Sequence, residues 1–195
     1  MKARRVKGLD PDGSFADNAR RIAAVRLGEL CDLAPKALDP AKPKKLHDMR
    51  IAAKRLRYVL EISRPALGPG AGEGVRTAKA LQELLGDIHD CDEMLPRVRR
   101  QGNDLHAADA EDMVRRAGPK ARDIEPELAS TAAHLDRYRG LEALALHLSA
   151  RREVLFNRFT REWARLEARD FAAALLASIS EPEPATTAPT APAGP

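Results

Sequence analysis

The sequence has 195 residues, a formal net charge of +4 and two cysteines, Cys31 and Cys91. This length is sufficient for one domain with a buried core, and two cysteines are too few for a disulfide framework. No stretch approaches the roughly 18 uninterrupted apolar residues of a membrane span. The basic N-terminus also lacks the apolar run of a secretory signal. We therefore expect a soluble, cytoplasmic protein without membrane association.

Helix-forming residues dominate the chain, and no segment alternates as a half-buried strand would. A basic N-terminal segment is predicted over residues 1–13. The first helix is predicted from Ser14, as its N-cap, to about residue 33, with Pro35 following its end. A second helix is predicted over about residues 42–65, with a proline tolerated in its first turn.

The glycine-rich stretch GPGAGEG, at 68–74, is predicted as a loop. The third helix is predicted over about 74–101, with Pro96 as a kink or local end. Residues 102–136 contain two further prolines. They are predicted as an irregular connector with one or two short helices.

A long helix is predicted over about 135–168, followed by a short helix that continues to about residue 179. The Pro/Ala/Thr-rich tail, 180–195, is predicted to be disordered. Long helices joined by short connections indicate an all-α bundle of antiparallel helices. The helical domain is thus expected to span 14–179.

The second predicted helix, which contains LHDMRIAAKRLRYVLEI at 46–62, is strongly basic. Between residues 42 and 58 a single acid, Asp48, accompanies these basic residues: Lys42, Lys44, Lys45, Arg50, Lys54, Arg55 and Arg57. At helical periodicity His47, Arg50, Lys54 and Arg57 share one face, opposite an apolar stripe. Like charges one turn apart destabilise a helix, and a bound phosphate chain would relieve that repulsion. The pattern favours a basic groove or face that binds a polyanion.

Two other predicted helices divide in a similar way. Lys79 shares a face with His89 on the third helix, and His147 heads a row of arginines on the long helix. These arginines are Arg151, Arg158, Arg161 and Arg165. Arg152 falls on the apolar side, so it must snorkel, pair with an acid or line a polar cavity. The alternative for each helix is an ordinary solvated outer face.

The acidic stretch GDIHDCDE, at 86–93, could suggest a metal site, but no second His/Glu element completes a shell. Pairing of these acids with arginines of neighbouring helices is the favoured alternative. The sequence contains neither a phosphate-binding glycine loop nor a nucleophile elbow. We therefore expect no catalytic residues, no metal and no cofactor.

Two blocks of the sequence resemble a known family. LHDMRIAAKRLRYVLEI, followed by LQELLGDIHDCDEML at 81–95, resembles the CHAD domain, the conserved histidine α-helical domain. The opening KARRVKGLDP and the late LHLSARREVLFNRF are also similar to short stand-alone bacterial members. This resemblance implies an all-helical fold that binds inorganic polyphosphate without catalysis and associates with polyphosphate granules.

By position, the family's basic helix matches His47, Arg50, Lys54, Arg55 and Arg57, and its second block includes His89. With the neighbouring cations, the expected polyphosphate-binding residues are Lys44, Lys45, His47, Arg50, Lys54, Arg55, Arg57, Lys79, His89, Arg151, Arg152, Arg158 and Arg161. The alternatives are generic RNA or DNA binding, a metal-dependent phosphohydrolase or an accessory to one, and a scaffold for an acidic partner helix.

Overall fold

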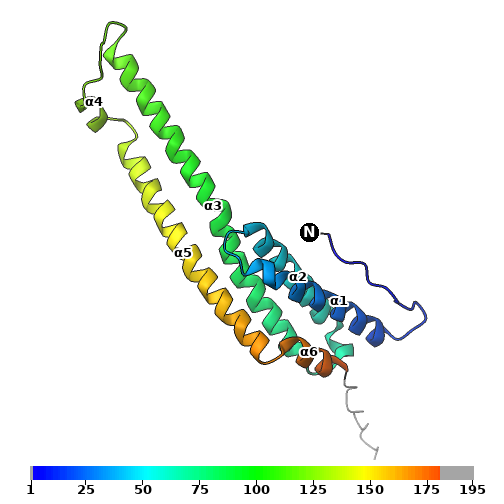
Figure 1. The fold of residues 1–195 in the computed structure, drawn as a ribbon. Coiled ribbons are helices and arrows are strands. Elements are labelled where there is room, and N and C mark those ends of the chain that lie inside the picture. The colour runs from blue at the N-terminus through cyan, green and yellow to red at the C-terminus, as the bar shows by residue number, and fades with distance from the viewer. Residues whose placement is uncertain (1, 181–195) are drawn as a thin grey trace, which may run out of the picture. The chain divides into compact units, whose positions relative to one another are not determined.

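The computed structural model describes residues 2–180 (Figure 1). Over this range the chain is helical and contains no strand, so the predicted all-α fold is confirmed. The helices are α1 (Phe15–Ala37), α2 (Pro43–Leu67), α3 (Ala71–Ala117), α4 (Glu127–Ser130), α5 (Leu135–Ala168) and α6 (Phe171–Ser180). Apart from Ser180, which ends α6, the predicted disordered tail lies outside the described residues. Within the described range, no helix is both long enough and apolar enough to cross a membrane.

The chain divides into two compact units. Among the described residues, unit 1 comprises 2–83 and 162–180, and unit 2 comprises 84–161. The boundaries between the units fall inside α3 and inside α5. The single helical domain expected over 14–179 stays a prediction.

In unit 1, α1 packs against α2 and α6. Ser14 caps α1 as predicted, because its hydroxyl accepts a hydrogen bond of 3.0 Å from the backbone N–H of Asp17. The prediction that Pro35 follows the end of α1 is wrong, because Pro35 lies inside the helix. The helix continues for a further turn because the small residues Ala34 and Ala37 are buried against the rest of the unit.

The apolar stripe predicted for α2 is confirmed. Its members Met49, Ala52, Ala53, Leu56 and Leu60 are buried, and Val59 is half-buried. Burial of a large aliphatic side chain stabilises a fold by roughly 1.5–3 kcal/mol, so this stripe fixes the orientation of α2 about its axis. The orientation of the helix determines where its cationic side chains lie.

The prediction of a loop over all of 68–74 is wrong, because α3 already begins at Ala71. The glycines there serve close packing instead. A Cβ atom at Gly74 would lie 2.6 Å from Leu175 Cδ1, and one at Gly70 would clash with the side chain of Ser178. Both contacts are with α6, so this stretch needs glycine because another helix approaches its backbone closely.

In unit 2, α3 and α5 run antiparallel, as predicted, and lie side by side in Figure 1. Their contacts follow opposite orders along the two helices. His106 contacts Tyr138 with ring centroids 4.1 Å apart, whereas Asp92 pairs with Arg152 further along α5. The helix predicted over 135–168 matches α5.

The prediction that the third helix ends near residue 101 is wrong, since α3 continues to Ala117 and Pro96 lies within it. The contacts of its distal half with α5 and the connector favour continuation of the helix. The end comes at Gly118, whose φ of 82° is the left-handed conformation of a helix C-terminus, and Pro119 follows it. Only the later part of 102–136 is irregular, and it contains the short α4.

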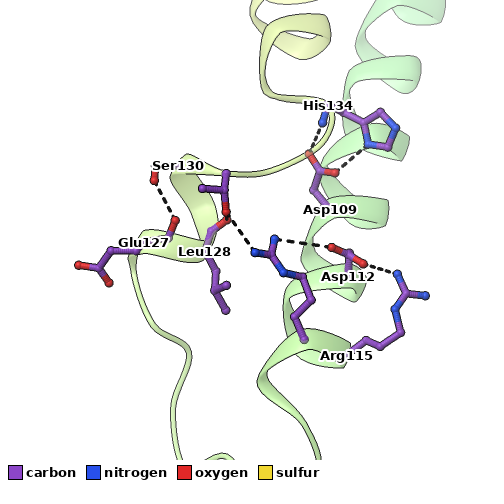
Figure 2. A network of polar contacts seen from close by, with 9 residues as sticks. Asp109, Asp112, Arg115, Glu127, Leu128, Ser130 and His134 are labelled. Atoms are coloured by element: carbon purple, nitrogen blue, oxygen red, sulfur yellow. Dashed lines mark hydrogen bonds and ion pairs between the residues drawn. The ribbon is translucent and has the colours of Figure 1, made fainter.

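Figure 2 shows the polar contacts that join the connector to α3 within unit 2. Asp109 accepts a hydrogen bond of 3.1 Å from the backbone N–H of His134, and its other oxygen lies 2.7 Å from His134 Nδ1. Arg116 donates a hydrogen bond of 3.3 Å to the hydroxyl of Thr131. These contacts join the end of α3 to the segment that precedes α5.

Candidate functional site

The cationic residues predicted on α2 are exposed to different extents. Lys44 and Lys54 are exposed, whereas His47, Arg50 and Arg57 are half-buried. Of the basic residues predicted to lie opposite the apolar stripe, some are therefore partly shielded from solvent by neighbouring side chains. A half-buried cation is held in fewer conformations than an exposed one, so less entropy is lost when it binds an anion.

Several cations of the predicted site already pair with acids within unit 1. These pairs are Lys45–Asp48 at 3.3 Å, Arg57–Glu61 at 3.1 Å and Lys79–Glu83 at 3.8 Å. Each joins residues three or four apart on one helix, a spacing at which such pairs contribute only about 0.2–0.5 kcal/mol. Because these pairs are weak, a ligand with higher charge density can replace the carboxylate.

Arg55 differs from its neighbours because it points toward α1. Its Nη1 lies 4.0 Å from Oε1 of Glu29, a residue that is only 2 % exposed. Glu29 also pairs with Arg26 Nη1 at 2.7 Å and accepts a hydrogen bond of 2.5 Å from the backbone N–H of Arg4. Arg55 therefore takes part in neutralising a buried carboxylate, a structural role that the sequence did not indicate.

Lys44 and Arg50 are the least engaged of the predicted site cations on α2. In the described part of the chain, neither side chain forms an ion pair, and the buried Nε of Arg50 has no hydrogen-bond partner there. A buried donor without a partner is costly, by about 1–3 kcal/mol. An anion that accepted a hydrogen bond from Arg50 would remove this cost.

A shallow pocket near the beginning of α2 brings further cations to Lys45. Its lining includes Lys2, Arg4 and Lys36, together with Glu29, Asp32 and Leu33. Sequence reasoning missed these three cations, because they come from the N-terminal segment and from the last turn of α1. The connector between α1 and α2 spans only residues 38–42, which keeps Lys36 near the start of α2.

In unit 2 the predicted pairing of the 86–93 acids is confirmed at two positions. Arg151 Nη2 lies 3.0 Å from Asp87 Oδ1, and Arg152 Nε lies 2.5 Å from Asp92 Oδ1. The hydrogen bond from Arg151 to Asp87 raises the pKa of the guanidinium above its ordinary value. Arg152 is thus paired with an acid, one of the outcomes expected for a cation on the apolar side of α5.

The other predicted residues of unit 2 are less constrained. Arg158 and Arg161 are exposed and, among residues 2–180, form no ion pair. His89 is half-buried on α3. In the same range, no three His, Cys, Asp or Glu side chains cluster as ligands of a metal ion would.

The predicted site residues thus divide between the two units: the cations of α2 and Lys79 belong to unit 1, and His89 and the α5 arginines belong to unit 2. The fold and these residues define an all-α protein whose second helix is rich in cations. Residues 3–99 match the family model of the CHAD domain, and this part of the chain belongs to the CHAD domain family. No curated protein and no solved structure gives a significant match to the chain.

The CHAD match divides the predicted site in sequence. It covers α1, α2 and α3 as far as residue 99. It therefore includes Lys79, His89 and every predicted residue of α2. It ends before α5, so Arg151, Arg152, Arg158 and Arg161 lie outside it. The presence of a CHAD domain is consistent with a polyphosphate-related function.

Proposed function

We propose that this protein binds inorganic polyphosphate without catalysis, through the cationic side chains of α2. The single observation that carries the proposal is the coincidence of the CHAD match with a helix whose cations Lys44 and Arg50 have no ion-pair partner in the described residues. Lys54, one turn after Arg50, is exposed and adds a third charge. Phosphate oxygens are the acceptors that arginine and lysine side chains favour.

Polyphosphate suits this arrangement because it presents many equivalent anionic groups in one chain. Each contact with a cation is modest, but binding of one phosphate raises the effective concentration of the next. The weakly paired Lys45, Arg57 and Lys79 can exchange their carboxylates for phosphates. In unit 2 we propose further ligands, namely His89, Arg151, Arg152, Arg158 and Arg161. In unit 1, Arg55 supports α2 from the side of α1.

The contacts of the acids at 86–93 support a non-catalytic role. Asp87 and Asp92 are engaged by arginines of α5, and Glu93 pairs with Arg97 at 3.2 Å. An arginine therefore neutralises each of these carboxylates. In a metal site, by contrast, the carboxylates would face the metal ion. A phosphohydrolase remains the rival activity, and phosphate release from polyphosphate with Mg²⁺ or Mn²⁺ tests it. We expect no release above the rate without protein.

The proposal is tested by combining Arg50→Ala with Lys54→Ala and titrating long-chain polyphosphate. We expect the affinity to fall by about tenfold or more, because two charge-assisted contacts are lost. Circular dichroism should show the helical content of the unmodified protein. The matched control is Arg137→Ala with Arg139→Ala, which removes two exposed arginines of α5 outside the site. Equal binding by the site variant and the control would overturn the proposal.

RNA or DNA binding through the same cations is the second candidate function. The low aromatic content of the chain, 4 %, offers few platforms on which bases could stack. We therefore expect polyphosphate to displace a single-stranded oligonucleotide at equal phosphate concentration.

We further propose that the protein resides in the cytoplasm at polyphosphate granules, where a fluorescent fusion should concentrate and the Arg50/Lys54 variant should not.

A further inference from the structure

Tyr58 lies on α2 among the cations of the candidate site, although neither the predicted site nor the core includes it. Tyr58 is 43 % exposed. Lys54 Nζ lies 5.6 Å from the ring centroid, and Arg57 Cζ lies 5.0 Å from it. One exposed ring therefore contacts two cations within a single turn of helix.

These contacts lie within the range of cation–π attraction, which extends to about 6 Å from the centroid. Lysine and arginine side chains have many rotamers when free, so their immobilisation costs conformational entropy. A ring that restricts them in advance reduces the entropy lost when an anion binds. Arg57 is restricted further, because Glu61 lies 3.1 Å from its Nε.

The ring leaves most donors of both cations available. An ammonium group has three N–H donors and a guanidinium has five, whereas a ring engages a cation from one side only. Lys54 is exposed, so its ammonium can contact the ring and a phosphate at the same time. The tyrosine therefore positions the cations without neutralising them, unlike a carboxylate.

We propose that Tyr58 is a positioning residue of the polyphosphate site, whose ring pre-orients Lys54 and Arg57 toward the ligand. This inference rests on the proposed function and adds a residue without charge to the site. The ring is expected to change the affinity for polyphosphate without changing the number of phosphate contacts, so these two properties of the site can be measured separately.

The test compares Tyr58→Leu and Tyr58→Phe with the unmodified protein, titrated with long-chain polyphosphate at several salt concentrations. The matched control is Ile62→Ala, which shortens the next exposed apolar side chain of α2, 76 % exposed, one turn away. We expect Tyr58→Leu to weaken binding about two- to fivefold, whereas Tyr58→Phe keeps the ring and binds as the unmodified protein does. The slope of log affinity against log salt should stay constant in Tyr58→Leu, because no charge is removed.

The outcomes separate this inference from the function on which it rests. If the unmodified protein does not bind polyphosphate, the proposed function fails and the inference fails with it. If it binds and Tyr58→Leu binds equally well, only the positioning role is overturned. Equal losses in Tyr58→Phe and Tyr58→Leu also overturn it, because they would identify the hydroxyl as the contact. In a Lys54→Ala background, the effect of Tyr58→Leu should shrink, since one of its two cations is gone.

Discussion

Asp109 of α3 binds His134 twice, through the backbone N–H at 3.1 Å and through Nδ1 at 2.7 Å. Asp109 is only 4 % exposed and lies where α5 begins, so a carboxylate of α3 accepts a hydrogen bond at the N-terminus of α5 (Figure 2). A negative charge there also interacts favourably with the dipole of α5. This contact explains how the connector after α3 leads back into an antiparallel helix.

Asp109→Ala should therefore loosen the beginning of α5. We expect a loss of about 1–3 kcal/mol, because a buried acceptor is removed and the donors of His134 lose their partner. Hydrogen exchange should become faster at residues 134–140, with little change in α1 and α2. The control is Asp104→Ala, an exposed acid of the same helix, which should leave exchange unaltered. Unchanged protection in Asp109→Ala would contradict the role given to this contact.

Arg55 and Arg50 should respond differently to truncation, although both belong to the predicted binding residues. Arg55→Ala removes a partner of the buried Glu29, which keeps Arg26 and the backbone N–H of Arg4. We expect a loss of about 1–2 kcal/mol in the free energy of unfolding, measured with urea, and a small effect on polyphosphate affinity. Arg50→Ala should show the opposite pattern, and Arg55→Lys should recover part of the stability. A larger loss of affinity in Arg55→Ala than in Arg50→Ala would refute this division.

The start of α1 should contribute to the pH dependence of stability. The hydrogen bond from the Ser14 hydroxyl to Asp17, 2.7 Å long, is the main cause that lowers the pKa of this carboxyl below 3.8. A lowered pKa in the folded state means stability that is present above pH 3.8 and is lost as the pH falls through the folded-state value. Asp17→Asn should therefore lose less stability than the unmodified protein when urea unfolding is compared at pH 5 and at pH 3. Asp12→Asn, at an exposed acid before the helix, is the control.

The sequence predicted the helices of this protein best where apolar periodicity and cap residues agree. The N-cap Ser14, the buried stripe of α2 and the bounds of α5 all follow from local signals. Prolines and glycines were misleading. Pro35 lies inside α1 and not after its end, and α3 continues well beyond Pro96. Gly74, predicted to be in a loop, lies inside α3, where it admits α6. A local rule for these residues fails where packing against a distant element determines the backbone.

The candidate site was predicted less completely than the fold. Helical periodicity showed which cations share a face of α2, but it could not show that Arg55 reaches Glu29 on another helix. It also could not place Lys2 or Lys36 beside Lys45, since these lie on separate segments of the chain. Tyr58 lies within the basic block, but a single aromatic residue on a helix carries no periodic signal that would assign it to the site.

The exposed arginines of α5 allow the reach of the proposed ligand to be measured. Arg158 and Arg161 lie outside the CHAD match, whereas Arg50 and Lys54 lie within it. We expect Arg158→Ala with Arg161→Ala to weaken binding of long polyphosphate while leaving short chains unaffected, because a longer chain has more phosphates available for cations other than those of α2. Arg50→Ala with Lys54→Ala should weaken binding at every length. For long chains, each double variant should also reduce the salt dependence, by about two in the slope of log affinity against log salt. Equal losses at all chain lengths in the Arg158/Arg161 variant would place these arginines in the primary contact, and no loss at any length would remove them from the site.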